Sequence, residues 1–228
     1  MVRQVLAPIH PDGWRFIAIF AVASVLLYFI AHPLGWIGAI ATAWCAYFFR
    51  DPWRVTPQRA GLAVAPADGI VVAVDRAPPP AELEMGSAPM LRIGVFLSIL
   101  DVHVNRMPVA GRVMKRVYRA GKFFNAGAPK AGEENERMAL RLAAKDGGEV
   151  AVVQIAGLIA RRIRCDVDAG QDVIAGQRFG LIRFGSRTDV YLPPEWTPLT
   201  LVGQRAVGGE TVIADARANE PPRQGTEH

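Results

Sequence analysis

Cysteine and histidine are scarce in this chain. Its 228 residues include two cysteines and four histidines. Two cysteines far apart exclude a disulfide framework and are typical of a reducing compartment. Neither residue type shows the spacing of a metal site, so we expect no metal ion. Because His10 and His32 lie in or before a long apolar segment and His228 is terminal, His103 is the histidine placed to serve a folded core.

Charged residues are absent between Arg15 and Arg50. This apolar stretch is too long for the core of a signal peptide and lacks a convincing cleavage site. Pro33 interrupts it, because proline disfavours helix in the residue before it. We therefore predict two helices of about 16 residues, each roughly 24 Å long and short of a 30 Å hydrocarbon core. Residues 1–56 are thus expected to form a membrane-associated helical hairpin, with a single tilted span as the alternative.

The chain has an excess of positive charge. Its net charge is +5 and its isoelectric point is near 9.6, which implies an anionic partner such as a membrane surface or a nucleic acid. The apolar segment favours the membrane, so no nucleic-acid partner is expected. Arg50 and Arg54 close the segment around Pro52 and Trp53, a pattern typical of an anchor facing lipid headgroups. We expect the protein at the cytoplasmic face of the cell membrane, hairpin-anchored or peripheral.

The composition changes after Pro57, where glycine, proline and valine replace long apolar runs. Short β-branched segments at regular spacing predict a mainly β catalytic domain over residues 57–228. A strong hairpin signal stands at Lys145–Gly148. Strands are expected within residues 65–74, 91–99, 111–118, 136–142, 149–155 and 179–182.

A faint internal repeat supports this fold class. Gly170–Gln177 recurs approximately as Gly203–Glu210, and each copy predicts a strand, a tight turn and a strand. The pattern resembles the barrel-sandwich hybrid fold of biotinyl and lipoyl carrier domains. Those carriers hold their cofactor on a lysine at a hairpin tip, whereas no lysine follows Lys145 in this chain. The sequence therefore predicts a barrel-sandwich-hybrid-like β core but argues against a carrier function.

One bond near the C-terminus could carry chemistry, the Gly185–Ser186 peptide bond. Glycine admits backbone conformations closed to other residues, and serine brings a hydroxyl within reach of the preceding carbonyl. Attack by Ser186 Oγ on that carbonyl would turn the amide into an ester. Loss of the ester by β-elimination would break the chain and leave a dehydroalanine, which hydrolyses to a pyruvoyl group. The alternative is an ordinary β-turn, for which Gly-Ser is common.

Two further residues would assist such chemistry. His103 titrates near neutral pH and can move a proton in either direction. Asp68, at a turn tip, could orient it, which would complete an Asp/His/Ser arrangement. Taken singly, Asp68 suits a turn and His103 suits a hydrogen-bonded core. Two rival functions also remain: a membrane-tethered serine hydrolase that uses Ser186, His103 and Asp68 but lacks a Gly-x-Ser-x-Gly elbow, and a non-catalytic barrel-sandwich adaptor.

Several motifs occur together in one order between residues 47 and 192, and their combination is far more specific than any single motif. They are Tyr47–Pro52, Pro66–Gly69, Asp101–Arg106, Gly121–Ala126, Asn135–Arg137, Ile155–Gly157, Arg161–Ile163 and Phe184–Arg187. In this set the chain resembles phosphatidylserine decarboxylase of the short, bacterial and archaeal, pyruvoyl-dependent type.

The resemblance implies a complete activity. It implies self-cleavage between Gly185 and Ser186 into a large chain, 1–185, and a small chain, 186–228, that stay together. Ser186 would become a pyruvoyl group, the only cofactor, with neither metal nor pyridoxal phosphate. Its ketone would form a Schiff base with phosphatidylserine and accept the electron pair as CO2 leaves. His103 would return a proton, and the product, phosphatidylethanolamine, would place the enzyme in phospholipid biosynthesis.

One position departs from the family pattern. Longer members carry a second histidine, assigned to processing, three residues after the first, and this place holds Arg106 here. Either His103 serves both processing and decarboxylation, or Asp68 alone is the base during cleavage.

Overall fold

The structure is a computed structural model that describes residues 7–128, 131–158, 162–183, 185–221 and 223–226. Arg161 and Phe184, which belong to two of the motifs above, lie outside the described residues. The chain divides into two compact units. One comprises residues 1–53 and 100–102, and the other comprises residues 54–99 and 103–228.

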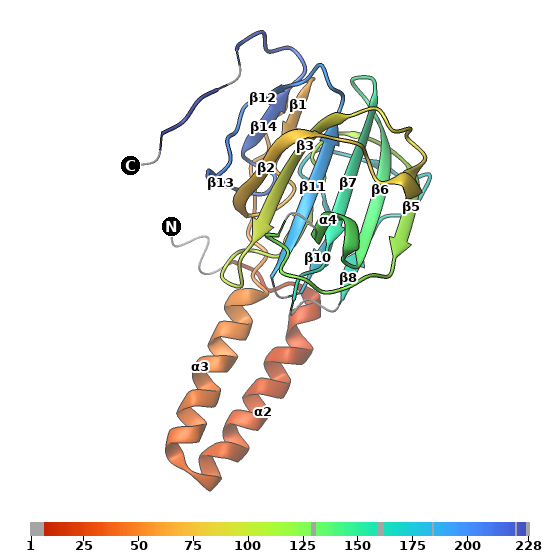
Figure 1. The fold of residues 1–228 in the computed structure, drawn as a ribbon. Helices are drawn as coiled ribbons and strands as arrows, with labels where there is room; N and C mark the ends of the chain where they lie inside the picture. The colour runs from red at the N-terminus through yellow and green to blue at the C-terminus, as the bar shows by residue number, and fades with distance from the viewer. Residues whose placement is uncertain (1–6, 129–130, 159–161, 184, 222, 227–228) are drawn as a thin grey trace. The chain divides into compact units, whose positions relative to one another are not determined.

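The first unit is a pair of helices. A short 3-10 turn, η1 (Pro11–Gly13), leads into α2 (Trp14–Ile30), and α3 (His32–Phe48) follows after a single extended residue, Ala31. The two helices lie side by side (Figure 1). Pro33 stands in the first turn of α3, where a missing N–H costs nothing. The prediction of two helices is confirmed, and each has 17 residues.

Small residues let the helices approach closely. The Ser24 hydroxyl donates a hydrogen bond to the carbonyl of Gly35 at 2.8 Å, and a Cβ at Gly38 would lie 2.8 Å from the Ser24 backbone. The outward side chains are large and apolar, with Phe29 81% and Ile30 77% exposed. The segment Pro11–Ile30 is long and apolar enough to cross a membrane, as judged by length and composition.

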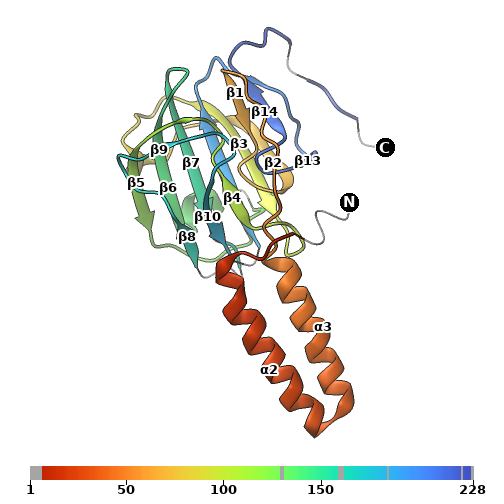
Figure 2. The ribbon, with the colours of Figure 1, turned by 180° about the vertical axis from the view of Figure 1, so that it is seen from behind.

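The second unit is built from three antiparallel sheets. The largest has eight strands in the order β13-β2-β3-β11-β7-β6-β5-β9, and two smaller sheets have the orders β1-β14-β12 and β4-β10-β8. The strands are β1 (Leu62–Val64), β2 (Gly69–Ala77), β3 (Met90–Leu97), β4 (Val104–Arg106), β5 (Gly111–Arg119), β6 (Arg137–Ala144), β7 (Glu149–Ile155), β8 (Ile163–Cys165), β9 (Asp172–Val173), β10 (Arg178–Ile182), β11 (Ser186–Leu192), β12 (Thr197–Pro198), β13 (Arg205–Ala206) and β14 (Val212–Asp215). The large sheet is curled into a half-barrel (Figure 2), which confirms the predicted mainly β fold.

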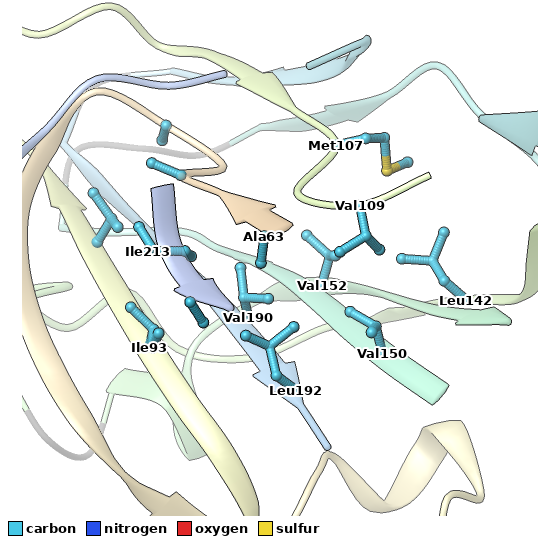
Figure 3. Packing of buried hydrophobic residues seen from close by; sticks show 14 of the residues in the cluster. Ala63, Ile93, Met107, Val109, Leu142, Val150, Val152, Val190, Leu192 and Ile213 are labelled. Carbon is cyan, nitrogen blue, oxygen red and sulfur yellow. The ribbon is translucent and has the colours of Figure 1, made fainter. Parts of the chain in front are cut away.

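The main core lies between the large sheet and the two small ones. Val152 and Val190 point into it from β7 and β11, and Met107 and Ile213 reach it from the other side (Figure 3). Because side chains alternate along a strand, Ser186 and Thr188 share the inner face of β11 with Val190. The strand therefore directs the Ser186 hydroxyl into the half-barrel rather than toward solvent.

The outer face of the same strands is covered by two short helices, η2 (Ala81–Leu83) and α4 (Ala131–Glu134). Beneath them Arg187 and Asp189, two residues apart on β11, form a two-pronged ion pair with contacts of 2.5 and 3.0 Å. Their side chains are 3% and 0% exposed. Burial raises the pKa of Asp189, and the adjacent guanidinium of Arg187 opposes that rise.

The internal repeat has a structural counterpart. In the first copy β9 and β10 flank the turn, and in the second β13 and β14 do. Each turn is bound in the same way: Gly176 N–H donates to the Met107 carbonyl at 2.8 Å, and Gly209 N–H donates to the Ala65 carbonyl at 2.8 Å. The repeated strand–turn–strand units are thus confirmed, and each turn is hydrogen-bonded to a segment that follows a strand of a small sheet, β4 or β1.

Candidate active site

Ser186 is the first residue of β11, a central strand of the large sheet. It pairs with Leu97 on β3, and the next residue, Arg187, pairs with both Phe96 on β3 and Ile155 on β7. Ser186 is 0% exposed, and its Oγ has no hydrogen-bond partner among the described residues. A buried hydroxyl left unpaired costs about 1–3 kcal/mol, so such groups concentrate where chemistry needs them.

Gly185 has a left-handed backbone with φ of +67°. A Cβ at this position would meet nothing within 4 Å, so space does not require glycine here. The conformation does, because the left-handed region costs other residues roughly 1–2 kcal/mol. The Gly-Ser pair therefore joins a backbone that only glycine adopts freely to a buried, unpartnered hydroxyl.

The carbonyl of Gly185 lies against a second glycine. A Cβ on Gly157 would fall 2.0 Å from the Gly185 oxygen and 3.3 Å from the Ala126 side chain. Asn135 fixes both neighbouring segments: its amide donates to the carbonyls of Ala156 at 2.7 Å and Phe124 at 2.8 Å. Its side-chain oxygen accepts the Phe124 N–H at 2.9 Å. The backbone around Gly157 is thus held where it touches the carbonyl that Ser186 would attack.

His103 contacts the same residue from another side. The Gly185 N–H donates to His103 Nε2 at 3.2 Å, which requires that nitrogen to be unprotonated in this arrangement. The imidazole is 0% exposed and comes from the segment that leads into β4. The structure therefore brings His103 to the Gly-Ser bond, as the sequence predicts.

Asp68 lies at the turn before β2, one residue before Gly69, which is in the same row of the sheet as Ser186. Ile70 on β2 pairs with Phe96 on β3, and Phe96 pairs with Arg187 on β11. Gly69 and Ser186, which precede Ile70 and Arg187, therefore lie in the next row and are two strands apart. That separation is about 10 Å at the usual strand spacing. Gly69 is needed because a Cβ there would fall 2.0 Å from the Phe96 carbonyl oxygen.

Both carboxylate oxygens of Asp68 accept hydrogen bonds. Arg54 Nη2 donates to Oδ2 at 2.6 Å, and the Gly208 N–H donates to Oδ1 at 2.8 Å. Gly208 belongs to the turn of the second repeat, in the chain segment that follows Ser186. Asp68 is therefore more than the tip of a turn, because it ties the segment before β1 to the segment before β14.

Comparison with known proteins identifies the family. The sequence profile of the family described as phosphatidylserine decarboxylase matches residues 41–214. A phosphatidylserine decarboxylase proenzyme of Paramagnetospirillum magneticum is 56% identical over 225 residues, which cover 99% of this chain and 94% of the relative. The chain belongs to the phosphatidylserine decarboxylase family.

Proenzymes with the same name from other bacteria agree. The one from Cereibacter sphaeroides is 54% identical over 99% of this chain and 97% of its own length. The one from Nitrobacter winogradskyi is 56% identical over 94% of this chain and 87% of its own length. The family and the enzyme class predicted from the motifs are thus confirmed.

The position that departs from the phosphatidylserine decarboxylase pattern has its own partner. Arg106 is 6% exposed, and its Nη1 donates to the Gly176 carbonyl at 3.0 Å. Its backbone N–H donates to the carbonyl of Pro66 at 2.8 Å. Arg106 therefore links the turn of the first repeat to the segment that carries Asp68.

A polar row that sequence reasoning missed lies on the inner face near Ser186. Gln154 Nε2 donates to Asn105 Oδ1 at 2.8 Å and to the Arg164 carbonyl at 3.1 Å, while Asn105 contacts Thr188 Oγ1 at 3.5 Å. Gln154 Oε1, like Ser186 Oγ, is buried without a partner among the residues described. Gln154 is the one polar residue between Val150 and Ile155 of β7, and this interruption of an apolar run was the available signal.

No set of three or more His, Cys, Asp or Glu side chains with the geometry of a metal site occurs within the described ranges. The groups gathered at the Gly-Ser bond are instead an imidazole, a hydroxyl and glycine backbone. Such a set fits a prosthetic group made from the chain itself, because Ser186 supplies a hydroxyl, Gly185 the preceding carbonyl, and His103 a nitrogen that accepts the Gly185 N–H.

Gly157→Ala tests the close approach to the Gly185 carbonyl, which the predicted self-cleavage would attack. The added methyl would overlap the Gly185 oxygen, so we expect the Gly185 carbonyl to shift and self-cleavage to slow by roughly tenfold to a hundredfold. The measurement is the fraction of cleaved chain over time on a denaturing gel.

Gly132→Ala is the matched control, because a Cβ there meets only Asp189 Oδ2 at 3.8 Å. It should cleave at the wild-type rate. Equal rates for Gly157→Ala and Gly132→Ala would mean that the contact with the Gly185 carbonyl has no part in cleavage.

Proposed function

We propose that this protein decarboxylates phosphatidylserine to phosphatidylethanolamine and CO2 in phospholipid biosynthesis, after cutting its own chain between Gly185 and Ser186. The main structural support for this proposal is the hydroxyl of Ser186, which is buried without a partner among the described residues, beside a left-handed Gly185. Membership of the phosphatidylserine decarboxylase family supports the substrate, and the names of the relatives, which are proenzymes, support a processing step. Neither a serine hydrolase nor a non-catalytic adaptor would need phosphatidylserine as substrate or a processing step.

Self-cleavage uses only groups of the chain. Ser186 Oγ loses its proton and attacks the Gly185 carbonyl carbon; the C–N bond breaks, the Ser186 nitrogen takes up a proton, and an ester links the two residues. Removal of the Ser186 α-proton then expels the Gly185 carboxylate by breaking the Cβ–O bond. The resulting dehydroalanine rearranges to an imine, which water hydrolyses to a pyruvoyl group and ammonia.

Two residues are candidates for moving these protons. His103 Nε2 already accepts a hydrogen bond from Gly185, so it can reach the reacting segment with an unprotonated nitrogen. Asp68 stands one residue before the row of the sheet that contains Ser186, with its carboxylate fixed by two donors. We assign both to the site, with His103 serving both stages or Asp68 alone serving as base in cleavage.

The sheet keeps the products of cleavage together. Strand β11 pairs with β3 along its whole length and with β7 along most of it, and the break would lie just before its first residue. The large chain, 1–185, would supply both neighbours, and the small chain, 186–228, would remain the central strand. The new end of the small chain therefore stays beside His103 without any covalent link.

The pyruvoyl carbonyl would supply an electron sink for the pair of electrons released as CO2 leaves the substrate. The chain's own part is to exclude water from that end, which the 0% exposure of Ser186 and His103 supports. His103 is also the group placed to return a proton to the α-carbon of the substrate.

The helices of the first unit are assigned to the membrane. At 17 residues each, α2 and α3 are about 25 Å long, and apart from Arg15 and His32 near their starts their exposed side chains are predominantly apolar. We propose that residues 1–56 act as a membrane-associated hairpin and residues 57–228 as the catalytic domain. By the tendency of basic residues to stay on the cytoplasmic side, the enzyme works at that face of the cell membrane.

Ser186→Ala tests the proposed function. Alanine has no hydroxyl to form the ester, so this variant should remain one full-length chain and release no CO2 from phosphatidylserine. Ser186→Cys should cleave slowly, since a thiol also permits the acyl shift. A wild-type chain that stays intact while it hydrolyses esters would instead support the serine hydrolase.

A deletion of residues 1–46 tests the assignment of the two units. The truncated chain should still self-cleave, because Asp68, His103 and Ser186 belong to the second unit, which has a core of its own. It should fail to float with lipid vesicles at high salt, because retention by apolar burial is lost with the helices. Full-length Ser186→Ala is the control and should float. An uncleaved truncated chain would contradict the assignment.

A further inference from the structure

Arg54, at the start of the second unit, has a side chain that is only 3% exposed. Its pattern with Trp53 predicts an anchor that faces lipid headgroups, and that prediction is wrong for this residue. Its Nη2 lies 2.6 Å from Asp68 Oδ2, and the Asp68 side chain is itself 14% exposed. The guanidinium is thus turned into the folded unit and onto a candidate site residue.

The backbone around Arg54 is held by the turns of both repeats. The Val55 N–H donates to Glu210 Oε1 at 2.8 Å, in the second repeat. Thr56 packs closely on Gly176, in the first repeat. A Cβ on Gly176 would fall 1.9 Å from the Thr56 hydroxyl oxygen. These contacts set the position of Arg54 independently of its own side chain.

Stability alone is a poor reason for such a pair. Burying two charges costs about as much as their attraction returns, and apolar replacements of buried pairs are often neutral or stabilising. A turn formed by Asp-Gly needs no arginine. The pair instead fixes the orientation of the Asp68 carboxylate. Arg54 holds Oδ2 and the Gly208 N–H holds Oδ1, which restricts rotation of the carboxylate.

We propose that Arg54 is a positioning residue for self-cleavage, which acts by fixing the Asp68 carboxylate at the N-terminal end of β2, one residue before the row that contains Ser186. The inference rests on the proposed function and adds to it a residue from outside the motif that carries Asp68. It also implies that the few residues after Trp53 belong to the processing machinery rather than to the membrane anchor.

The test follows the cleavage of full-length chains made by cell-free synthesis in the presence of lipid vesicles. Arg54→Met should cleave roughly tenfold to a hundredfold more slowly than the wild type, as expected when a reacting group is misplaced. Arg54→Lys, which keeps the charge but not the planar fork, should fall between the two. The melting temperature of each variant is measured in the uncleavable Ser186→Ala background.

Two further variants separate positioning from folding. Arg141→Met is the control for loss of an arginine–carboxylate pair away from Asp68, because Arg141 donates to the carboxylate of Glu149 at 2.8 Å through Nε. It should cleave at the wild-type rate. The double variant Arg54→Met/Asp68→Asn leaves neither charge of the pair buried alone. It should regain melting temperature relative to Arg54→Met but should cleave no faster.

The possible results distinguish a positioning role of Arg54 from a role in folding, and both from a failure of the proposed function. Wild-type cleavage rates in both Arg54→Met and Arg54→Lys would overturn the inference while leaving the proposed function intact. So would a double variant that regains cleavage along with stability, since Arg54 would then matter only for folding. If Arg54→Met fails to fold, a folded Arg54→Lys chain that cleaves slowly supports the inference, and one that cleaves normally overturns it. A wild-type chain that never cleaves contradicts the proposed function itself.

Discussion

The site depends on the way in which one central strand holds Ser186. Strand β11 is hydrogen-bonded to β3 from its first residue and to β7 from its second, so the serine has almost no freedom of position. The alternation of the strand turns the hydroxyl into the half-barrel, where it has no partner among the described residues. The same pairing would hold the small chain in place once the bond before it is broken.

Close approach of backbone segments is the second requirement, and glycine meets it. Gly185 supplies a left-handed conformation, Gly157 lets a neighbouring segment touch the Gly185 carbonyl, and Gly69 lets the Asp68 turn lie against β3. Side chains then fix what the glycines bring together, with His103 on the Gly185 N–H and Arg54 on Asp68. The proposed reactivity would thus arise from restricted geometry around ordinary residue types.

Much of this was predictable from the sequence, for physical reasons. Proline in a charge-free stretch predicts the two helices, alternating β-branched runs predict the strands, and the Gly-Ser bond with one central histidine predicts the chemistry. The contact of Arg54 with Asp68 was not predictable, because a basic residue after an apolar helix normally faces headgroups, and the contact joins segments 14 residues apart. Gln154 was missed, and the contacts of Asn135, which stands in one of the motifs, were not foreseen, for the same reason: their partners come from other strands and loops.

The most direct test of the account is the intact mass of the full-length protein purified from membranes. We predict two chains, one ending at Gly185 and one spanning residues 186–228 that is lighter than its encoded sequence by one molecule of ammonia. That loss is the signature of a serine converted to a pyruvoyl group. A single unbroken chain, or a small chain that begins with an unmodified Ser186, would contradict the account.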